Sequence, residues 1–295
     1  MRVPDSVAVS GRRAEGGGRA DRGAPVVVQA ERGWASLGLR DIWEYRELLF
    51  FLTWRELQGT YRQTALGMIS WVFLRPLLNV LVLSVVFGRV VRVPTDGVPY
   101  PLFALAALIP WGFFANAVQR AARSLVDNMH VISKVYFPRM VIPIAGASSG
   151  LVDFAASFVV LLVFLVIYRM PLRWETLAVP LFLLIAFAFS LATGLWLATL
   201  SVKYRDVSFA VTFLLQAFMY ASPVVYPASM VPRSALWLYR LNPMTGVIEG
   251  FRWALLGSVP LPGRWILISV LLVVLLLISG AFVFRRTERT AVDIL

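Results

Sequence analysis

Apolar residues are concentrated in six long stretches, which are separated by shorter polar and charged segments. A helix needs roughly 20 predominantly apolar residues to cross about 30 Å of hydrocarbon, and these stretches are close to that length. The pattern therefore predicts an all-α membrane protein with six transmembrane helices in one domain, residues 41–295. The predicted spans are about 66–87, 101–118, 141–168, 177–200, 207–225 and 265–284.

Two segments precede the first predicted span. Residues 1–40 are rich in glycine and arginine, so they predict a disordered leader. They lack the apolar core of a secretory signal peptide, and a lipid- or partner-binding role for the arginines is the alternative. Residues 41–62 place Ile42, Tyr45, Leu49 and Leu52 on one helical face, although Glu56 interrupts it. This predicts an amphipathic helix in the headgroup layer, or a helix that merely leads into the membrane.

The segment between the fifth and sixth spans is too long for a turn and too polar to cross the bilayer. Asn242 is a favourable N-cap, Pro243 suits the first helical position, and Gly257 suits the helix end. Glu249 and Arg252 are three residues apart and can pair on this helix. We predict two short re-entrant helices here. Irregular backbone at membrane depth requires surrounding protein or water, so this segment is a candidate outer gate.

The composition narrows the functional classes. Hydrophobic residues make up 59% of the 295 residues and charged residues 15%, with a formal net charge of +12. The basic residues lie beside apolar stretches, which favours contact with membrane lipids and orientation by positive loops over nucleic-acid binding. Cysteine is absent and there is one histidine, so the sequence offers no disulfide and no thiolate or histidine-rich metal site. Lys and Arg are more frequent on one side of the spans, which predicts that both termini are cytoplasmic.

Six motifs occur in order along the chain: YRQTALGMISWVFLRPLL, SKVYFPRMVIPIA, LVDF, YRDV, SPVVYP followed by LNPMTGVIEGFRWALLG, and FRRTERTAVDIL. In order and spacing they resemble the permease subunits of ABC exporters for lipid-linked polysaccharides, such as O-antigen, capsule and teichoic acid (polyol phosphate) polymers. The resemblance runs from about Tyr45 to Leu295. It implies a homodimer of six-span subunits around a channel, with two copies of a separate nucleotide-binding ATPase subunit.

The resemblance also implies a coupling helix, because in this family the inner loop after the second span docks in a cleft of the ATPase. Residues 125–135 can form about three helical turns, and Pro138 prevents continuation into the third span. Tyr136 and Phe137 are the expected aromatic anchors, and Lys134 and Arg139 add charge. A solvated basic loop that only sets the topology, with His130 exposed, is the alternative. The predicted coupling residues are Val131, Ile132, Ser133, Lys134, Tyr136, Phe137, Pro138 and Arg139.

Polar and aromatic side chains within the spans form a second group of candidates. Arg75 can line the path and attract a phosphate, pair with another residue, or extend to the inner headgroups. Asp153 needs a partner, and an arginine–aspartate or carboxylate–backbone pairing is favoured over a substrate contact. Trp71 and Tyr220 are candidates for an aromatic conduit for sugar rings, with belt or core packing as the alternative.

These features predict a transport subunit of a bacterial plasma (inner) membrane that moves a polyisoprenoid-linked glycan to the outer side. The sequence has no G-x-x-x-x-G-K-[ST] phosphate loop, so we expect ATP and Mg on the partner ATPase and no cofactor, metal or catalytic residue in this chain. The alternatives are an ABC exporter of a small drug or lipid and, from another class, a membrane-embedded glycan polymerase or ligase. The latter requires catalytic groups converging on outer loops, where Glu249 is the only carboxylate well inside the re-entrant segment.

Overall fold

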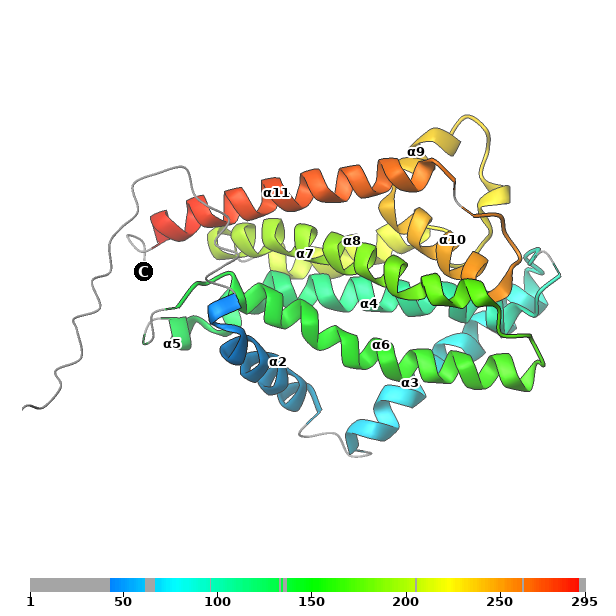
Figure 1. The fold of residues 1–295 in the computed structure, drawn as a ribbon, viewed down its shortest axis with the longest axis horizontal. Coiled ribbons are helices and arrows are strands. Elements are labelled where there is room, and N and C mark those ends of the chain that lie inside the picture. The colour runs from blue at the N-terminus through cyan, green and yellow to red at the C-terminus, as the bar shows by residue number, and fades with distance from the viewer. Residues whose placement is uncertain are drawn as a thin grey trace, which may run out of the picture. The chain divides into compact units, whose positions relative to one another are not determined.

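The computed structural model describes residues 43–61, 67–95, 97–132, 134, 137–204, 206–261 and 263–291, and every regular element within these ranges is a helix (Figure 1). The expected leader, residues 1–40, lies outside them. The helices are α2 (Arg46–Tyr61), α3 (Gly67–Leu83), the π-helix η1 (Ser84–Val90), α4 (Tyr100–Asp127), α5 (Met129–Ile132), α6 (Val141–Ile167), the 3₁₀-helix η2 (Trp174–Ala178), α7 (Val179–Lys203), α8 (Val207–Tyr220), the 3₁₀-helix η3 (Ala228–Met230), α9 (Leu236–Leu241), α10 (Pro243–Leu256) and α11 (Trp265–Ala291).

Five helical segments of the described chain are long and apolar enough to cross a membrane: Phe73–Val90, Tyr100–Asp127, Val141–Ile167, Trp174–Lys203 and Trp265–Glu288. The sixth predicted span, 207–225, is shorter in the structure. Helix α8 has 14 residues and ends at Tyr220, because the residue before Pro223 is disfavoured in an α-helix. At 1.5 Å per residue it extends about 21 Å, so the count of six spans stays a prediction.

Helix α4 is the central helix of the described chain. It packs along α6 and α7 and also contacts α3, α8 and α10. Of its candidate span 72% is buried, compared with 6% for the span that contains α3. Small residues permit the close approach of backbones, since a Cβ added at Gly194 on α7 would overlap Ala121 on α4. A core built this way holds α4, α6 and α7 together as one packed unit.

Helix α4 continues to Asp127, beyond the predicted end at residue 118, because its last polar side chains find partners on neighbouring helices. Gln119 Nε2 donates to Thr212 Oγ1 at 3.2 Å, and Arg123 Nη2 donates to the Ser208 carbonyl oxygen at 3.1 Å. Both partners lie on α8. Polar residues that end the apolar stretch in the sequence therefore do not end the helix.

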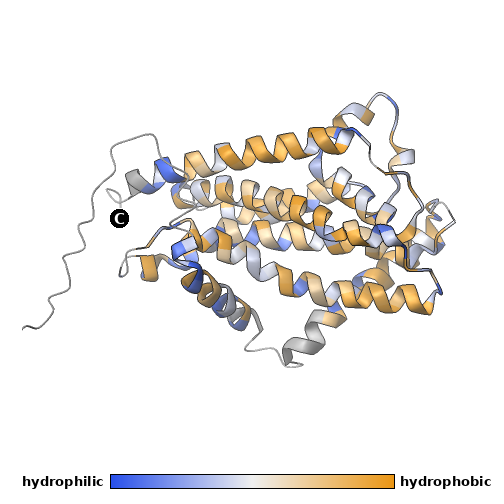
Figure 2. Ribbon diagram, in the orientation of Figure 1, coloured by the Kyte–Doolittle hydropathy of each residue, from blue (hydrophilic) through white to orange (hydrophobic). Residues whose placement is uncertain are grey.

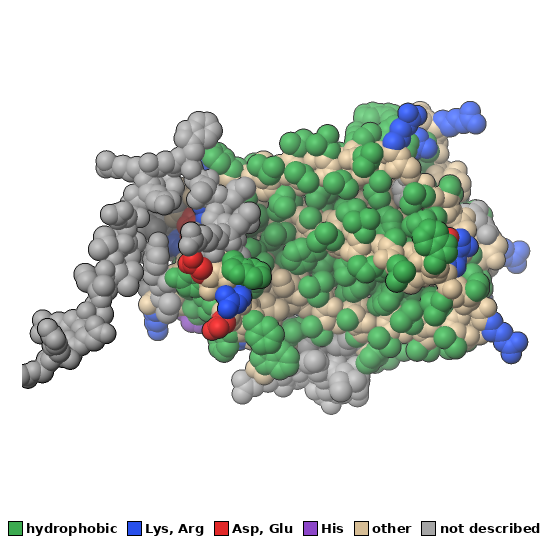
Figure 3. Space-filling view, viewed as in Figure 1, with side chains coloured by type: hydrophobic (Ala, Val, Ile, Leu, Met, Phe, Trp, Pro, Cys, Tyr) green, Lys and Arg blue, Asp and Glu red, His purple; other side chains and the backbone are tan. Residues whose placement is uncertain are grey.

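The exposed surface of the spans is apolar, as a bilayer requires. Apolar residues run along α6, α7 and α11, and hydrophilic residues gather near the C-terminal end of α11 (Figure 2). The space-filling view of the same face shows hydrophobic side chains across its middle and Lys and Arg toward its two ends (Figure 3). The described chain is thus a multi-pass helical membrane protein.

Helix α2 packs through the apolar face that the sequence predicts. Leu52 is buried, and Tyr45 and Leu49 lie against the same cluster of core residues. Trp43 and Phe50 lie elsewhere on the helix surface and are 72% and 73% exposed. A helix with core contacts on one side and exposed aromatic rings on another is suited to the headgroup layer.

Helix α10 begins and ends where the sequence predicts. The Asn242 side-chain oxygen accepts a hydrogen bond from the Met244 backbone N–H at 2.9 Å, and Pro243 occupies the first helical position. Gly257 has φ 63°, a left-handed conformation that terminates the helix, and a Cβ there would overlap the Arg173 guanidinium. The bounds of α10 are confirmed, and α9 is a second short helix ahead of it; their re-entry into the membrane stays a prediction.

Candidate functional site

The predicted coupling residues, Val131 to Arg139, belong to residues 128–139, which we call the coupling segment. Its described residues lie where the C-terminal parts of α4, α7 and α11 come together. We call this region the α5 end and the region of α9, α10 and residues 257–264 the α10 end (Figure 1). The two ends differ in how their side chains are held, and each contains predicted site residues.

The helix expected over residues 125–135 is interrupted at Asn128. Helix α4 ends at Asp127, Asn128 has φ −107° and ψ 14°, and α5 contains only Met129–Ile132. The Asn128 side chain donates from Nδ2 to the Ser124 carbonyl oxygen at 2.8 Å, and the same oxygen accepts the Asn128 backbone N–H at 3.2 Å. In place of the predicted three-turn helix the structure has a bend at Asn128 followed by a single turn.

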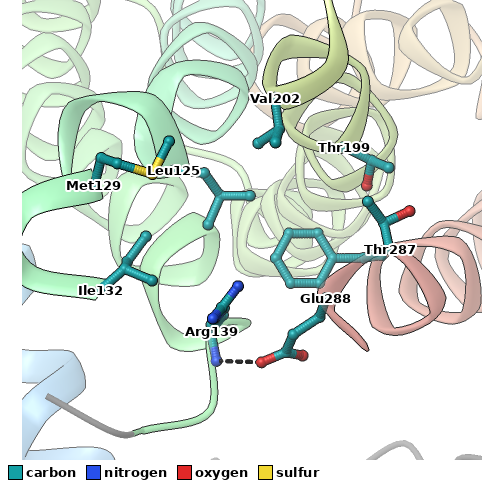
Figure 4. A pocket seen from close by; sticks show the side chains of 9 residues that line it. Leu125, Met129, Ile132, Arg139, Thr199, Val202, Thr287 and Glu288 are labelled. Carbon is teal, nitrogen blue, oxygen red and sulfur yellow. Dashed lines mark hydrogen bonds between the residues drawn. The ribbon is translucent and has the colours of Figure 1, made fainter. Parts of the chain in front are cut away.

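Hydrogen bonds fasten the coupling segment at both ends. At its start, Arg55 on α2 donates from Nη2 to Asn128 Oδ1. At its finish, the Arg139 backbone N–H donates to the Glu288 carboxylate on α11 at 3.1 Å (Figure 4). A hydrogen bond to a charged acceptor contributes about 1.5–3 kcal/mol, roughly twice a neutral one. The segment is thus tied to two helices that are far apart in the sequence.

A second hydrophobic cluster lies beneath the coupling segment, separate from the main core around α4. Its buried members come from α2, α4, α6, α7, α11 and the coupling segment: Leu52, Leu125, Phe137, Met140, Val141, Ile142, Ala145, Leu195, Ala198, Ala281 and Phe284. A small cavity of about 30 Å³ remains beside it (Figure 4). A displacement of the segment would therefore press on five helices at once.

Phe137 packs inside the chain, since it is 4% exposed and belongs to the second cluster. Its role as a docking anchor stays a prediction. An apolar ring next to a preformed core is more stable there than in water. Lys134 and His130 are exposed, whereas Val131, Ile132, Pro138 and Arg139 are half-buried. Ser133 and Tyr136 lie outside the described residues, so the docking role of Tyr136 also stays a prediction.

At the α10 end, Arg252 is the largest of the fully buried side chains in the described chain, at 1% exposure. Its Nη2 donates to the Val224 carbonyl oxygen at 3.1 Å, and its guanidinium carbon lies 3.6 Å from the centre of the Phe103 ring on α4. A buried cation requires such partners. Arg252 thus joins α10, the segment after α8 and the start of α4. The sequence identified the residue but not these partners.

Glu249, the predicted partner of Arg252, is only half-buried. Burial raises the pKa of the Glu249 carboxyl, while the nearby charges of Arg252 and Arg240 act in the opposite direction. Glu249 and Arg252, two of the predicted gate residues, therefore interact electrostatically. Arg252 is fully buried, whereas Glu249 is half-buried. Asn242, the third, donates from Nδ2 to Ser222 Oγ at 2.8 Å and so ties the start of α10 to the end of α8.

An ion pair stabilises the loop that supports the end of α10. Arg173 donates from Nη2 and Nε to the two Glu175 carboxylate oxygens at 2.6 and 3.2 Å. The two contacts form a fork between the guanidinium and the carboxylate. The guanidinium lies against Gly257, where its charge favours the carbonyl-rich end of the helix.

Asp153 pairs with Arg120, a residue that the sequence reasoning did not single out. Arg120 on α4 donates to the Asp153 carboxylate on α6 at 2.7 Å and to Ser149 Oγ, also at 2.7 Å. Both charged side chains are 15% exposed. This is the type of arginine–aspartate pairing that the sequence favoured. The signal for Arg120 was its place just beyond an apolar stretch, but its partner depends on how the helices pack.

The three conduit candidates do not form a defined group within the described residues. Arg75 is exposed on α3, and Tyr220 is 61% exposed at the end of α8. The side chain of Trp71 lies outside the described part. Exposed side chains in a span must face lipid, water or another chain, and for Arg75 lipid is the most costly of these.

No group of three or more His, Cys, Asp and Glu side chains that could hold a metal ion occurs in the described part of the chain. Arg120 with Asp153, Arg173 with Glu175, and Arg252 with the Val224 carbonyl oxygen and the Phe103 ring all contact other protein groups. The fold and these sites together define the class, a multi-pass helical membrane protein. Its α5 end is packed around an apolar cluster, and its α10 end contains a buried arginine.

Comparison with known proteins identifies the family. Residues 47–256 match the ABC-2 type transporter model, and the chain belongs to that family of transport permeases. It is 32% identical over 256 residues to the O-antigen export system permease protein RfbA of Myxococcus xanthus, covering 85% of this chain and 96% of that relative. A Klebsiella pneumoniae protein of the same name is 27% identical over 84% of this chain and 95% of its own length.

A more distant relative is the polysialic acid transport protein KpsM of Escherichia coli, 22% identical over 79% of this chain and 91% of that protein. The resemblance drawn from the six motifs, to permeases of polysaccharide exporters, is confirmed by these matches. All the relatives described here are transport proteins by name, which supports a transport subunit rather than an enzyme.

Proposed function

We propose that this chain is the membrane subunit of an ATP-driven exporter that moves a polyisoprenoid-linked polysaccharide from the cytoplasmic to the outer side of the bacterial plasma membrane. Two copies form the channel and two copies of a separate ATPase subunit drive it. ATP and Mg are bound by the ATPase, and this chain supplies the path. Both termini and the α5 end face the cytoplasm, and the α10 end faces outward.

The observation that carries the proposal is the attachment of the coupling segment at two points over a cluster shared by five helices. A segment that only set the topology would need positive charge but no such attachment. With Asn128 tied to α2 and Arg139 tied to α11, a push on the exposed surface around Lys134 is passed to both helices. The names of the relatives, O-antigen and polysialic acid transport proteins, support a polysaccharide as the substrate.

The remaining candidates take roles along the proposed path. Arg75, exposed on a poorly buried helix, faces the path near a second copy of the chain, where it attracts the phosphate of the lipid carrier. Trp71 and Tyr220 provide aromatic surface for sugar rings. Helix α10 closes the outer end, capped at Asn242 and Pro243 and braced by Arg252 with Glu249.

Co-purification with a co-expressed ATPase subunit tests the coupling role. Lys134 is exposed and makes no core contact, so Lys134→Glu should leave the fold intact while reversing the charge that steers docking. We expect about tenfold less ATPase to co-purify, which corresponds to about 1.4 kcal/mol. Arg233→Glu, an exposed charge reversal at the α10 end, is the matched control and should retain the ATPase. Equal retention by both variants contradicts the proposal.

The attachment at Arg139 can be tested separately from docking. Glu288→Ala removes the carboxylate that accepts the Arg139 N–H, whereas Glu288→Gln keeps an oxygen acceptor. We expect Glu288→Ala to retain the ATPase but to lower polysaccharide export, measured as polymer at the cell surface, and Glu288→Gln to restore most of it. Export that is unchanged in Glu288→Ala would show that the segment does not act through α11.

A further inference from the structure

A cavity of about 660 Å³ lies at the α10 end, between α9, α10, the start of α11 and residues 257–264 that join the last two. Its volume falls within the range of small-molecule sites, about 300–1,000 Å³. None of its lining residues belongs to the coupling segment. The export proposal gives a role to one lining residue, Glu249, but none to the cavity itself. In Figure 1 the three helices around it meet at one end of the chain's bundle.

Charges of both signs line this cavity. Arg240 comes from α9 and Arg264 from the residues just before α11, while Glu249 comes from α10. The Arg240 guanidinium lies over the Trp265 ring, 4.8 Å from its centre, which fixes its position at the wall. Arg264 is exposed, whereas Glu249 is half-buried. The arrangement offers one exposed cation, Arg264, and a half-buried cation and a half-buried carboxylate, Arg240 and Glu249.

Buried hydroxyl groups complete the lining. Thr245 is 2% exposed, and its Oγ1 has no hydrogen-bond partner among the described residues; Ser258 Oγ is in the same situation. Both residues line the cavity. Tyr239 Oη is a third such hydroxyl on a lining residue. Buried hydroxyls are normally satisfied by protein or water, so three unpartnered ones around a single cavity favour a polar occupant.

The cavity lies at the level of lipid headgroups. The span Trp265–Glu288 begins at its wall, so Trp265 marks the membrane–water interface. Below it, α11 exposes Leu267, Leu271 and Leu275 in succession. A lipid whose headgroup entered the cavity would lay its acyl chains along this apolar stripe.

We propose that the cavity binds the headgroup of phosphatidylethanolamine, with the phosphodiester held by Arg240 and Arg264 and the primary ammonium held by Glu249. A zwitterionic headgroup can pair with both signs of charge, since a two-carbon chain joins its anionic phosphodiester to its cationic ammonium group. An anionic headgroup such as phosphatidylglycerol leaves Glu249 without a cation, and a neutral sugar unit leaves all three charges uncompensated.

Native mass spectrometry of the full chain in detergent tests this assignment. The protein is mixed with equal amounts of phosphatidylethanolamine and phosphatidylglycerol of the same acyl composition, and the adducts are counted. We expect phosphatidylethanolamine to be retained about tenfold more often, which corresponds to one charge-assisted contact. Equal retention of the two lipids, or displacement of phosphatidylethanolamine by a soluble oligosaccharide, overturns the proposal.

Two variants separate the contacts. Glu249→Gln should abolish the preference between the two lipids while retaining both, because only the ammonium contact is lost. Arg264→Gln, at an exposed position, should lower retention of both lipids about tenfold. Arg233→Gln, an exposed arginine that does not line the cavity, is the control and should match the wild type. A wild-type preference that persists in Glu249→Gln also overturns the assignment. ATPase co-purification is unchanged in all three variants, so this test and that of the export proposal fail independently.

Discussion

The α5 end and the α10 end are stabilised in opposite ways. At the α5 end, the buried cluster is apolar and the polar contacts lie around its edge, from Arg55 to Asn128 and from Arg139 to Glu288. At the α10 end, the charge is inside, where Arg252 is 1% exposed, and a cavity of about 660 Å³ lies outside it. The cavity left at the α5 end is only about 30 Å³.

The difference shows how one bundle can serve two purposes. A tightly filled cluster transmits displacement, because interiors near crystal density do not compress. A buried arginine such as Arg252 fixes the irregular backbone at Val224 through a directional hydrogen bond, and it does so without filling all the space around it. On the proposed function, the first end receives the stroke from the ATPase and the second controls what leaves.

Arg252→Ala should have the largest effect on stability. The substitution removes the contact with Phe103, leaves the Val224 carbonyl without its donor and creates a cavity, for a combined loss of about 4 kcal/mol. Thermal unfolding in detergent, followed by the fluorescence of the 10 tryptophans, measures it. Arg252→Lys keeps the charge but not the planar fork and should be intermediate. A midpoint equal to that of the wild type would mean that the buried arginine does not stabilise the α10 end.

Phe137→Ala should destabilise the chain by about 3 kcal/mol, since a buried ring is lost from the second cluster. This effect appears in the isolated chain, before any ATPase is added. The same unfolding assay measures it, with the exposed Lys134→Ala as a control that leaves the midpoint unchanged. An unaltered midpoint for Phe137→Ala, together with lost ATPase binding, would support the docking role expected of this ring.

Glu175→Gln should have the smallest effect, because the Arg173 side chain of the pair is 41% exposed. The substitution removes the charge of the acceptor but keeps one oxygen that can accept from Arg173. We expect a slightly lower unfolding midpoint for Glu175→Gln at low salt and a smaller difference at high salt, because salt screens exposed charges. A difference that is the same at both salt concentrations would exclude the ion pair as its cause.

Local signals in the sequence were sufficient to predict where α10 begins and ends. Its N-cap, first-turn proline and terminal glycine each act within a few residues, so Asn242, Pro243 and Gly257 fixed its bounds without knowledge of its neighbours. The main apolar spans were also predictable, because the bilayer imposes their length. The family followed from motifs in register, and the comparisons support it.

Contacts between distant helices were not predictable from those signals. The partner of Asp153 is Arg120, which lies on another helix, and the burial of Phe137 depends on residues from five helices. The bend at Asn128 was also missed, although it is local. The sequence on each side of Asn128 favours a helix, and a single asparagine side chain that bonds to a backbone carbonyl does not outweigh that pattern in the sequence. The burial of Phe137 and the burial of Arg252 both depend on how the helices pack, and periodicity along the sequence does not show it.

Helix α4 has 28 residues and so extends about 42 Å at 1.5 Å per residue. Phe103, near its start, contacts Arg252, and Asn128, at its end, begins the bend that leads into α5. Because α4 packs along both α6 and α7, a shift imposed at one end of α4 would be passed to these two helices as well. On the proposed function, α4 would thus connect the ATPase with the buried guanidinium of Arg252 at the other side of the membrane.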